Sequence, residues 1–221
     1  MEHQIITTSD GSKTIYLPHL DETYHSSHGA IQEAVHVFIR HGVQAIEQHE
    51  IRIFEMGFGT GLNALLAYVE SEQSNRNIHY SGIEAYPVDT ETVMLMDYCS
   101  LIGKEHYTKF EKLHTPDWNT KHQLTDLFSF EKIHAKIEEF TPPQEQFDVV
   151  FFDAFGPRVQ EDMWGPAILQ KMYDLLKPNG FLVTYCAKGQ VKRDLKSLGF
   201  TIEPLPGPPG KREMTRAWKY I

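Results

Sequence analysis

The sequence has only two cysteines, Cys99 and Cys186, which are too few for a disulfide framework or a cysteine-rich metal site. It also lacks any apolar run near the roughly 20 residues that a membrane-spanning helix requires. The N-terminal residues include Glu2 and Asp10 and have no apolar centre, unlike a signal peptide. The twelve histidines show no metal-ligand spacing. These absences predict a cytoplasmic protein without a metal or a membrane partner.

The chain also lacks an overall basic charge, because 21 Lys and Arg residues face 30 Asp and Glu residues, a net charge of −9. That balance alone argues against a nucleic-acid partner. The charge is uneven, however: residues 188–221 hold eight basic and three acidic residues (+5), which leaves −14 for residues 1–187. The basic residues are Lys188, Lys192, Arg193, Lys196, Lys211, Arg212, Arg216 and Lys219. This segment fits either a local phosphate-binding surface or a solvated helix face.

The most informative segment is the glycine-rich run Phe-Glu-Met-Gly-Phe-Gly-Thr-Gly-Leu-Asn at residues 54–63. An apolar run leads into Glu55, glycines follow at every second position, and an apolar helical stretch comes next. This pattern predicts a strand, a tight turn and a helix, because glycine permits positive φ angles and close approach of a ligand. The first N–H groups of the helix would face an anionic ligand group. An acid before the loop suits a ligand with an ammonium group and hydroxyls, such as S-adenosylmethionine (SAM).

Three alternatives compete with a SAM site at this loop. A phosphate-binding P-loop needs Lys-Ser or Lys-Thr after the glycines, and neither follows Gly61. The dinucleotide fingerprint needs G-x-G-x-x-G, but the third glycine falls one place early. Glu84 ends a second strand-like run from Asn77, and an acid there binds ribose hydroxyls in NAD and SAM enzymes alike. SAM is favoured over NAD, and a glycine turn without a ligand is the third alternative.

Alternating strand-like and helical segments predict a single α/β domain over residues 1–221. Residues 1–45 form an N-terminal extension, with a β-hairpin over 4–16 around Ser9-Asp10-Gly11-Ser12 and a helix over 28–41. Residues 46–221 form a Rossmann-like core, a doubly wound sheet that ends in an antiparallel hairpin. Its expected strands are 51–56, 77–85, 130–137, 147–155, 181–186, 200–205 and 213–221. Its expected helices are 61–70, 87–99, 166–176 (closed by a turn at 177–180) and 190–198; residues 100–128 stay unassigned.

The apolar run 147–155 contains two acids with different predicted roles. Asp148 opens this strand and is interpreted as a solvated edge residue. Asp153 precedes a turn, which places its carboxylate at the edge where open α/β sheets bind ligands. Burial there would favour the neutral carboxyl, whereas hydrogen bonds or a cationic acceptor would oppose it. Asp153 is therefore the candidate for binding an amine and accepting its proton, with a turn or helix-cap aspartate as the simpler alternative.

Two further side chains have ordinary structural interpretations beside functional ones. Trp164, in Met163-Trp164-Gly165-Pro166, could stack on a substrate ring, although large aromatic side chains more often belong to the core. His134 lies between apolar residues and is most simply a strand residue.

Four strings of this sequence resemble the methyltransferase domain of the MnmC/MnmD tRNA-modification enzymes. They are the glycine loop 55–63, the segment 24–38 with Tyr-His-Ser-Ser-His-Gly-Ala-Ile-Gln-Glu, the Asp-Ala-Phe-Gly-Pro run 153–157 with Asp162-Met-Trp164, and Gly-Lys-Arg-Glu-Met at 210–214. The resemblance covers nearly the whole chain. The glycine loop alone is common to SAM enzymes, but its combination with the other strings is specific.

The resemblance implies a class I SAM-dependent methyltransferase with SAM as cofactor. It implies N-methylation of 5-aminomethyl-(2-thio)uridine at the tRNA wobble position to the 5-methylaminomethyl form. The anticodon arm of tRNA would be the partner, docked by the basic C-terminal segment. Bifunctional members of the family carry a second, flavin-dependent oxidase domain. Because this sequence ends at Ile221, we expect a separate enzyme to supply the aminomethyl precursor.

The residues and the resemblance together define the expected site. Asp153 would face the acceptor amine as general base, and Phe155 would help to line the uracil pocket. The expected SAM-binding residues are Glu55, Gly57, Phe58, Gly59, Gly61, Asn63, Glu84 and Glu138. The expected substrate-binding residues are Phe155, Pro157, Trp164, Lys211, Arg212, Glu213 and Met214. Many SAM enzymes place an aspartate after the third strand for the adenine amino group; here Ala135-Lys136-Ile137-Glu138 stands there, so Glu138 or the backbone would serve.

Two other functions remain open from the sequence. One is a SAM-dependent methyltransferase or aminopropyltransferase acting on a free small amine, since an acidic pocket also suits polyamines. The other is a SAM-binding module without catalysis. A requirement for tRNA discriminates against the first, and any methyl transfer discriminates against the second.

Overall fold

The computed structural model describes residues 3–141 and 143–220, so the last residue of the predicted strand 213–221 lies outside the described part. Three short antiparallel strands form a separate N-terminal sheet. They are β1 (Gln4–Thr7), β2 (Lys13–Leu17) and β3 (Glu22–Thr23). Gln4 pairs with Tyr16, which confirms the predicted hairpin. Asp10 stabilises its turn by accepting a 3.0 Å hydrogen bond from the backbone N–H of Ser12.

The central sheet has eight strands in the order β10-β11-β9-β8-β4-β5-β7-β6. The strands are β4 (Glu50–Met56), β5 (Asn77–Glu84), β6 (Lys121–Thr125), β7 (Phe128–His134), β8 (Phe147–Phe152), β9 (Leu176–Thr184), β10 (Thr201–Pro206) and β11 (Glu213–Trp218). The five strands from β9 to β7 pair in parallel, whereas β6 and β11 run antiparallel to their neighbours. This order confirms the Rossmann-like sheet with a C-terminal antiparallel hairpin. The strand order reverses between β4 and β8, the position where such folds bind ligands.

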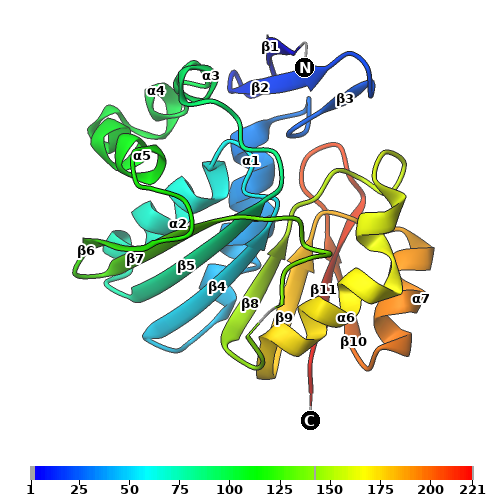
Figure 1. The fold of residues 1–221 in the computed structure, drawn as a ribbon. Coiled ribbons are helices and arrows are strands. Elements are labelled where there is room, and N and C mark those ends of the chain that lie inside the picture. The colour runs from blue at the N-terminus through cyan, green and yellow to red at the C-terminus, as the bar shows by residue number, and fades with distance from the viewer. Residues whose placement is uncertain (1–2, 142, 221) are drawn as a thin grey trace.

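Helices cover both faces of the central sheet (Figure 1). On one face lie α1 (Ala30–Ala34), the π-helix η1 (Val35–Arg40), the 3₁₀ turn η2 (Val43–Ala45), α2 (Leu62–Gln73) and α5 (Tyr107–His114). On the other lie α6 (Pro166–Leu175) and α7 (Gly189–Ser197). Short segments are α3 (Thr90–Met94), α4 (Cys99–Ile102), η3 (Lys104–His106) and η4 (Glu161–Trp164). The N-terminal sheet lies beyond the same end of the central sheet as the β10–β11 turn (Figure 1).

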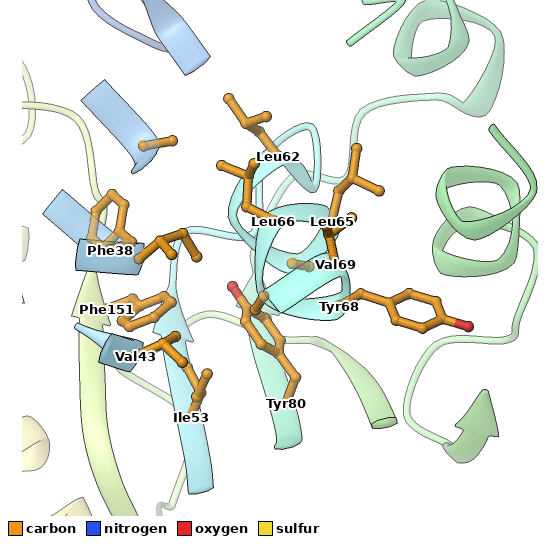
Figure 2. Packing of buried hydrophobic residues seen from close by; sticks show 14 of the residues in the cluster. Phe38, Val43, Ile53, Leu62, Leu65, Leu66, Tyr68, Val69, Tyr80 and Phe151 are labelled. Atoms are coloured by element: carbon orange, nitrogen blue, oxygen red, sulfur yellow. The ribbon is translucent and has the colours of Figure 1, made fainter. Parts of the chain in front are cut away.

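The helix that follows the glycine loop is fixed by a large apolar core (Figure 2). Helix α2 is buried on nearly all sides, because its sequence from Leu62 to Val69 is almost entirely apolar. Tyr68 stacks on Phe128 with ring centroids 4.6 Å apart. On the same face, Phe38 of η1 packs against Phe151 of β8, with centroids 5.1 Å apart. This packing holds the start of α2 in a constant position relative to β4 and β8.

Asp148 at the start of β8 is paired rather than solvated, so the interpretation of it as a solvated edge residue is wrong. Its carboxylate accepts hydrogen bonds of 2.7 Å from the Lys177 ammonium and of 2.7 Å from the backbone N–H of Arg52. The side chain is only 18% exposed. These bonds join β4, β8 and β9 at the end of the sheet opposite the ligand-binding end. Asp148 therefore stabilises the sheet.

Two predicted elements differ from the structure. The helix predicted over 87–99 is wrong as one element: α3 ends at Met94 and α4 begins at Cys99. Asp97 between them has a φ of 50°, which interrupts a right-handed helix. The predicted turn at 177–180 is part of β9, which begins at Leu176 and shifts register against β8. In the unassigned stretch 100–128 lie α5 and β6.

Candidate functional site

The loop between β4 and α2 requires glycine at Gly57. Its φ of 91° lies in the region that side chains rarely adopt, and an added Cβ would lie 2.7 Å from the Asp153 carbonyl oxygen. Gly59 and Gly61 also have positive φ angles of 52° and 74°. A Cβ at Gly61 would meet the His114 imidazole at 2.9 Å. At Gly57 the loop therefore lies directly against the chain that follows β8.

Glu84 at the end of β5 fixes the other side of this loop. One carboxylate oxygen accepts a 3.0 Å hydrogen bond from the Gly59 N–H, and the other accepts a 2.9 Å bond from the Tyr86 N–H. Each oxygen has two lone pairs, so both can still accept from a ligand hydroxyl. Glu84 borders the same cavity as Gly57 and Gly59. The structure thus brings the ends of β4 and β5 together, with Glu55 on the first and Glu84 on the second.

We expect Glu84→Ala to weaken SAM binding by roughly 1–3 kcal/mol. The substitution removes charged hydrogen-bond acceptors for ribose, and it removes the hydrogen bond that the Gly59 N–H donates to Glu84. Titration calorimetry measures this loss. Glu131→Ala on the neighbouring strand β7 is the matched control, since Glu131 does not border the cavity. Equal affinities of Glu84→Ala and the wild type would show that Glu84 does not contact the ligand.

The cavity has a volume of about 770 Å³, within the range of cofactor sites. It extends from the glycine loop to the N-terminal sheet, and Tyr24 and His25 from residues 1–45 form part of its wall. Neither residue was predicted to line the site, because no local pattern in the extension indicates that it folds over the loop. Burial lowers the pKa of His25 to about 4, so its ring is neutral at physiological pH. The part of the wall that Tyr24 and His25 form therefore carries no charge at physiological pH.

Asn63 connects the two carboxylates nearest the glycine loop. Its Nδ2 donates hydrogen bonds of 2.9 Å to Glu55 Oε1 and of 2.8 Å to Asp153 Oδ2. Glu55 is fully buried. The Oδ1 atom of Asn63 is buried and has no hydrogen-bond partner among the described residues. An unpaired acceptor beside two carboxylates suits the ammonium group of SAM, so the residues present fit this cofactor.

Both carboxyl groups in this arrangement are hard to ionise. Burial raises the pKa of Asp153 to about 7, with a contribution from the Glu33 carboxylate, whereas Asn63 and Lys211 act in the opposite direction. Burial also raises the pKa of Glu55 well above its usual value, and the nearby Asp153 charge adds to this. A carboxyl group poised near neutral pH can hold a cation and exchange a proton with it. The sequence analysis expected burial to favour the neutral carboxyl of Asp153, and the raised pKa agrees with that expectation.

The segment after Asp153 presents an aromatic wall. Phe155 borders the cavity and meets Tyr24 edge-to-face, with ring centroids 5.1 Å apart. Trp164 is only 3% exposed, packs against Phe152 and donates a 2.7 Å hydrogen bond from Nε1 to the Phe155 carbonyl oxygen. Trp164 therefore orients Phe155 and has no free face for stacking on a substrate. Pro157 lies in the turn after Phe155, outside the residues that border the cavity.

The far end of the cavity is bordered by the chain after β7. Ala135, Lys136, Ile137 and Glu138 all contribute to its wall. Glu138 is exposed, and its carbonyl oxygen accepts a 2.7 Å hydrogen bond from the Lys171 ammonium. His134 is a strand residue, as predicted, but β7 ends there and not at Ile137; His134 also borders the cavity. Phe58 borders it as well, although its side chain is 3% exposed and packs with Trp118 and Phe130.

The four residues of the Lys-Arg-Glu-Met string point to different places. Lys211 forms an ion pair with the buried Glu33 of α1. Glu213 forms an ion pair with Lys192 of α7, and Met214 is completely buried in the core. Arg212 alone is exposed. The string therefore does not form a continuous substrate-binding surface: Met214 cannot touch a substrate in this structure, and the partly exposed Lys211 ammonium is held by Glu33.

Within residues 3–141 and 143–220, no group of three or more His, Cys, Asp or Glu side chains could hold a metal ion. In the same residues, no helix has both the length and the apolar character to cross a membrane.

Comparisons with known proteins agree with this geometry. Residues 99–220 match the model of a family described as S-adenosyl-L-methionine-dependent methyltransferase. The bifunctional protein MnmC for tRNA 5-methylaminomethyl-2-thiouridine biosynthesis from Cupriavidus necator is 30% identical over 91% of this chain and 32% of its own length. The MnmC from Hydrogenovibrio crunogenus is 28% identical over 96% of this chain and 33% of its own length. The chain thus spans about a third of the curated relatives that it matches.

A solved structure gives the same result. The crystal structure of MNMC2 from Aquifex aeolicus superposes with a TM-score of 0.76 at 25% identity, over 98% of this chain and 69% of that one. The resemblance to the MnmC methyltransferase domain is confirmed by these matches. The family match covers more than half of the chain and includes the strand that leads to Asp153. This chain therefore belongs to the S-adenosyl-L-methionine-dependent methyltransferase family, and SAM is its cofactor.

Proposed function

We propose that this chain N-methylates 5-aminomethyl-(2-thio)uridine at the tRNA wobble position, giving the 5-methylaminomethyl nucleoside. The observation that carries the proposal is the Asp153 carboxyl group, which borders the SAM cavity and has a pKa raised to about 7. The relatives named above, which participate in tRNA 5-methylaminomethyl-2-thiouridine biosynthesis, support the choice of acceptor. The reaction requires a tRNA that already carries the aminomethyl group.

The chemistry follows from the residues around Asp153. An alkylammonium group has no lone pair and cannot attack a methyl group until it loses a proton. The Asp153 carboxylate binds the ammonium and accepts that proton, and solvent then takes it away. Asn63 fixes the carboxylate through its 2.8 Å hydrogen bond, which aligns the amine. When bound, SAM supplies a methyl group already activated by its sulfonium.

The remaining residues shape the part of the cavity where the acceptor base would lie. Phe155 offers an aromatic ring at the cavity wall, and Tyr24 and Trp164 hold it in place. An unpaired wobble base can lie against such a ring, as bases of single-stranded RNA do in other proteins. The glycine loop, Glu84 and Asn63 would hold SAM on the opposite side of Asp153.

Mass spectrometry of wobble nucleosides tests the proposal directly. The protein is incubated with SAM and tRNA that carries the aminomethyl group, and a mass gain of one methyl group is expected on that nucleoside. Spermidine without RNA is the parallel acceptor. Methylation of spermidine but not of tRNA would favour an enzyme for small amines, and no transfer to either would favour a SAM-binding module without catalysis.

A surface on α7 and the β10–β11 turn suits the RNA backbone. We define the α7 basic face as the exposed residues Lys188, Arg193, Lys196 and Arg212. No ion pair within the described residues engages any of the four. The Lys192–Glu213 ion pair places Arg212 next to α7. Four other basic residues of the C-terminal segment are held in ion pairs, namely Lys192, Lys211, Arg216 and Lys219.

We expect the double variant Lys188→Ala/Arg212→Ala to raise the KM for tRNA several-fold and to flatten its salt dependence. Each lost phosphate contact should reduce the log–log salt slope by about 0.7, the value for single strands. SAM affinity should not change. Lys121→Ala, an exposed lysine on the opposite edge of the sheet, is the matched control. An unchanged KM and slope in the double variant would show that RNA docks elsewhere.

A further inference from the structure

A partly buried ion pair between Glu33 and Lys211 interacts electrostatically with Asp153 and has no part in the chemistry described so far. Glu33, in the short helix α1, is 8% exposed, and its carboxylate accepts a hydrogen bond from the Lys211 ammonium. Lys211 belongs to the turn between β10 and β11. The pair therefore connects the N-terminal extension to the C-terminal hairpin across the ligand-binding end of the sheet.

The Lys211 ammonium also lies over an aromatic ring. Its Nζ is 3.9 Å from the ring centroid of Tyr185, the residue that follows β9. The Tyr185 hydroxyl donates a 2.8 Å hydrogen bond to the carbonyl oxygen of Ala154, the neighbour of Asp153. Glu33, Tyr185 and Lys211 are thus arranged around the backbone that carries Asp153. A carboxylate and a ring face together make a strong cation site.

Both members of the ion pair act electrostatically on Asp153. The Glu33 charge raises the pKa of Asp153, and the Lys211 charge lowers it. Several other groups face Asp153 or interact with its charge: Glu55 on β4, Asn63 on α2, Tyr80 on β5, Tyr98 before α4, and Tyr185 after β9. Among the residues that the structure describes, Lys211 is the only cation that shifts the pKa of Asp153.

This arrangement poses a problem for an amine-methylating enzyme. A lysine ammonium has the same chemistry as the acceptor's primary ammonium group, so it competes for the same carboxylate. If Lys211 were free to bond Asp153, it would block the acceptor and stabilise the carboxylate as a weaker base. In the structure, Glu33 and the Tyr185 ring hold Lys211 instead.

We propose that Glu33 is a positioning residue for Asp153: it holds the Lys211 ammonium, so that the Asp153 carboxylate stays open for the acceptor amine. This inference rests on the proposed function, because it assigns a role relative to the amine acceptor. It also explains why a lysine can lie beside an amine-binding carboxylate without blocking it. Lys211 in turn balances the buried charge of Glu33.

Opposite substitutions in the pair give opposite expected results. In Glu33→Gln, Lys211 is released toward Asp153. Its charge should lower the pKa of Asp153, so the acid limb of kcat/KM for tRNA should move to lower pH. Because Lys211 then occupies the carboxylate, the plateau of kcat/KM at high pH should fall about tenfold or more. In Lys211→Met, the negative charge of Glu33 is uncompensated, so the limb should move to higher pH. In the double variant Glu33→Gln/Lys211→Met, the limb should return to within about half a pH unit of the wild type.

The titration of the Asp153 carboxyl group can also be followed by carbon-13 NMR, without any acceptor. This readout separates the inference from the proposed function: a wild type that methylates no tRNA refutes the function, whereas the NMR shifts still test the pair. Shifts of opposite sign in the two single variants, cancelled in the double variant, support the inference. Shifts of the same sign, no shifts, or a double variant without recovery would overturn it.

Folding is controlled separately, since removing one partner of a buried ion pair can destabilise the chain. Thermal unfolding and SAM affinity are measured for every variant. Glu203→Gln is the matched control, because Glu203 forms an ion pair with Arg216 of the same hairpin and does not contribute to the pKa of Asp153. If Glu33→Gln does not fold, the double variant is compared with Lys211→Met. The inference requires that the acid limb of kcat/KM lies at lower pH in the double variant than in Lys211→Met.

Discussion

Asp153→Asn should lower methyl transfer by about 10²-fold or more while SAM affinity changes only a few-fold. Asparagine keeps the size of the side chain and can still contact Asn63, but it cannot accept a proton from the acceptor ammonium. Single-turnover kinetics with tRNA measure the chemical step, and calorimetry measures SAM affinity. A parallel loss of SAM affinity would instead make Asp153 a cofactor-binding or structural residue.

The pH profile gives the same prediction a second readout. Because burial raises the pKa of Asp153 to about 7, the base is largely protonated below that pH and ionised above it. Wild-type kcat/KM should therefore rise with pH through an apparent pKa near 7, and Asp153→Asn should lose this limb. Asp148→Asn is the matched control, since Asp148 lies at the opposite end of β8 and pairs with Lys177.

Gly57→Ala should weaken SAM binding at least tenfold and lower the melting temperature. A Cβ at this position would lie 2.7 Å from the Asp153 carbonyl oxygen, and the φ of 91° adds backbone strain of about 1–3 kcal/mol. Relief of the clash must displace either the loop or Asp153, so methyl transfer should fall as well. Calorimetry and thermal unfolding measure the two effects.

Gly189→Ala is the control for this substitution. Gly189 is the first residue of α7, and an added Cβ would meet only the end of the flexible Arg193 side chain, at 3.3 Å. This variant should bind SAM like the wild type. If Gly57→Ala also kept full SAM affinity, the glycine loop would not lie against the bound cofactor.

The parts of the site that the sequence predicted are those encoded by local patterns. Glu55, Glu84 and Asp153 each lie at or next to the carboxyl end of a strand, and parallel strands bring their carboxyl ends to one edge. That rule is sufficient to predict that the three acids lie at the same end of the sheet. The glycine spacing likewise predicted the turn, because positive φ angles are a local property of the chain.

The parts that the sequence missed depend on contacts between distant segments. Glu33 and Lys211 meet only because the extension folds across the end of the sheet, and no local pattern encodes that contact. Charge counting treated Lys211 as equivalent to Arg212, although the structure pairs Lys211 with a buried acid and exposes Arg212. Asp97, with its φ of 50°, splits the predicted helix 87–99 in a stretch whose composition suits a helix.

The contact between Tyr24 and Phe155 means that the cofactor site is built from both the N-terminal extension and the loop after β8. Arg158 strengthens this junction by donating a 3.0 Å hydrogen bond to Glu22. A nascent chain cannot complete the site until the eighth strand and its following loop have left the ribosome. The extension is synthesised before the loop that carries Phe155. Until that loop is made, Tyr24 lacks the aromatic ring against which it packs. We expect SAM to bind the completed site, so its binding should stabilise the folded chain and not its folding intermediates.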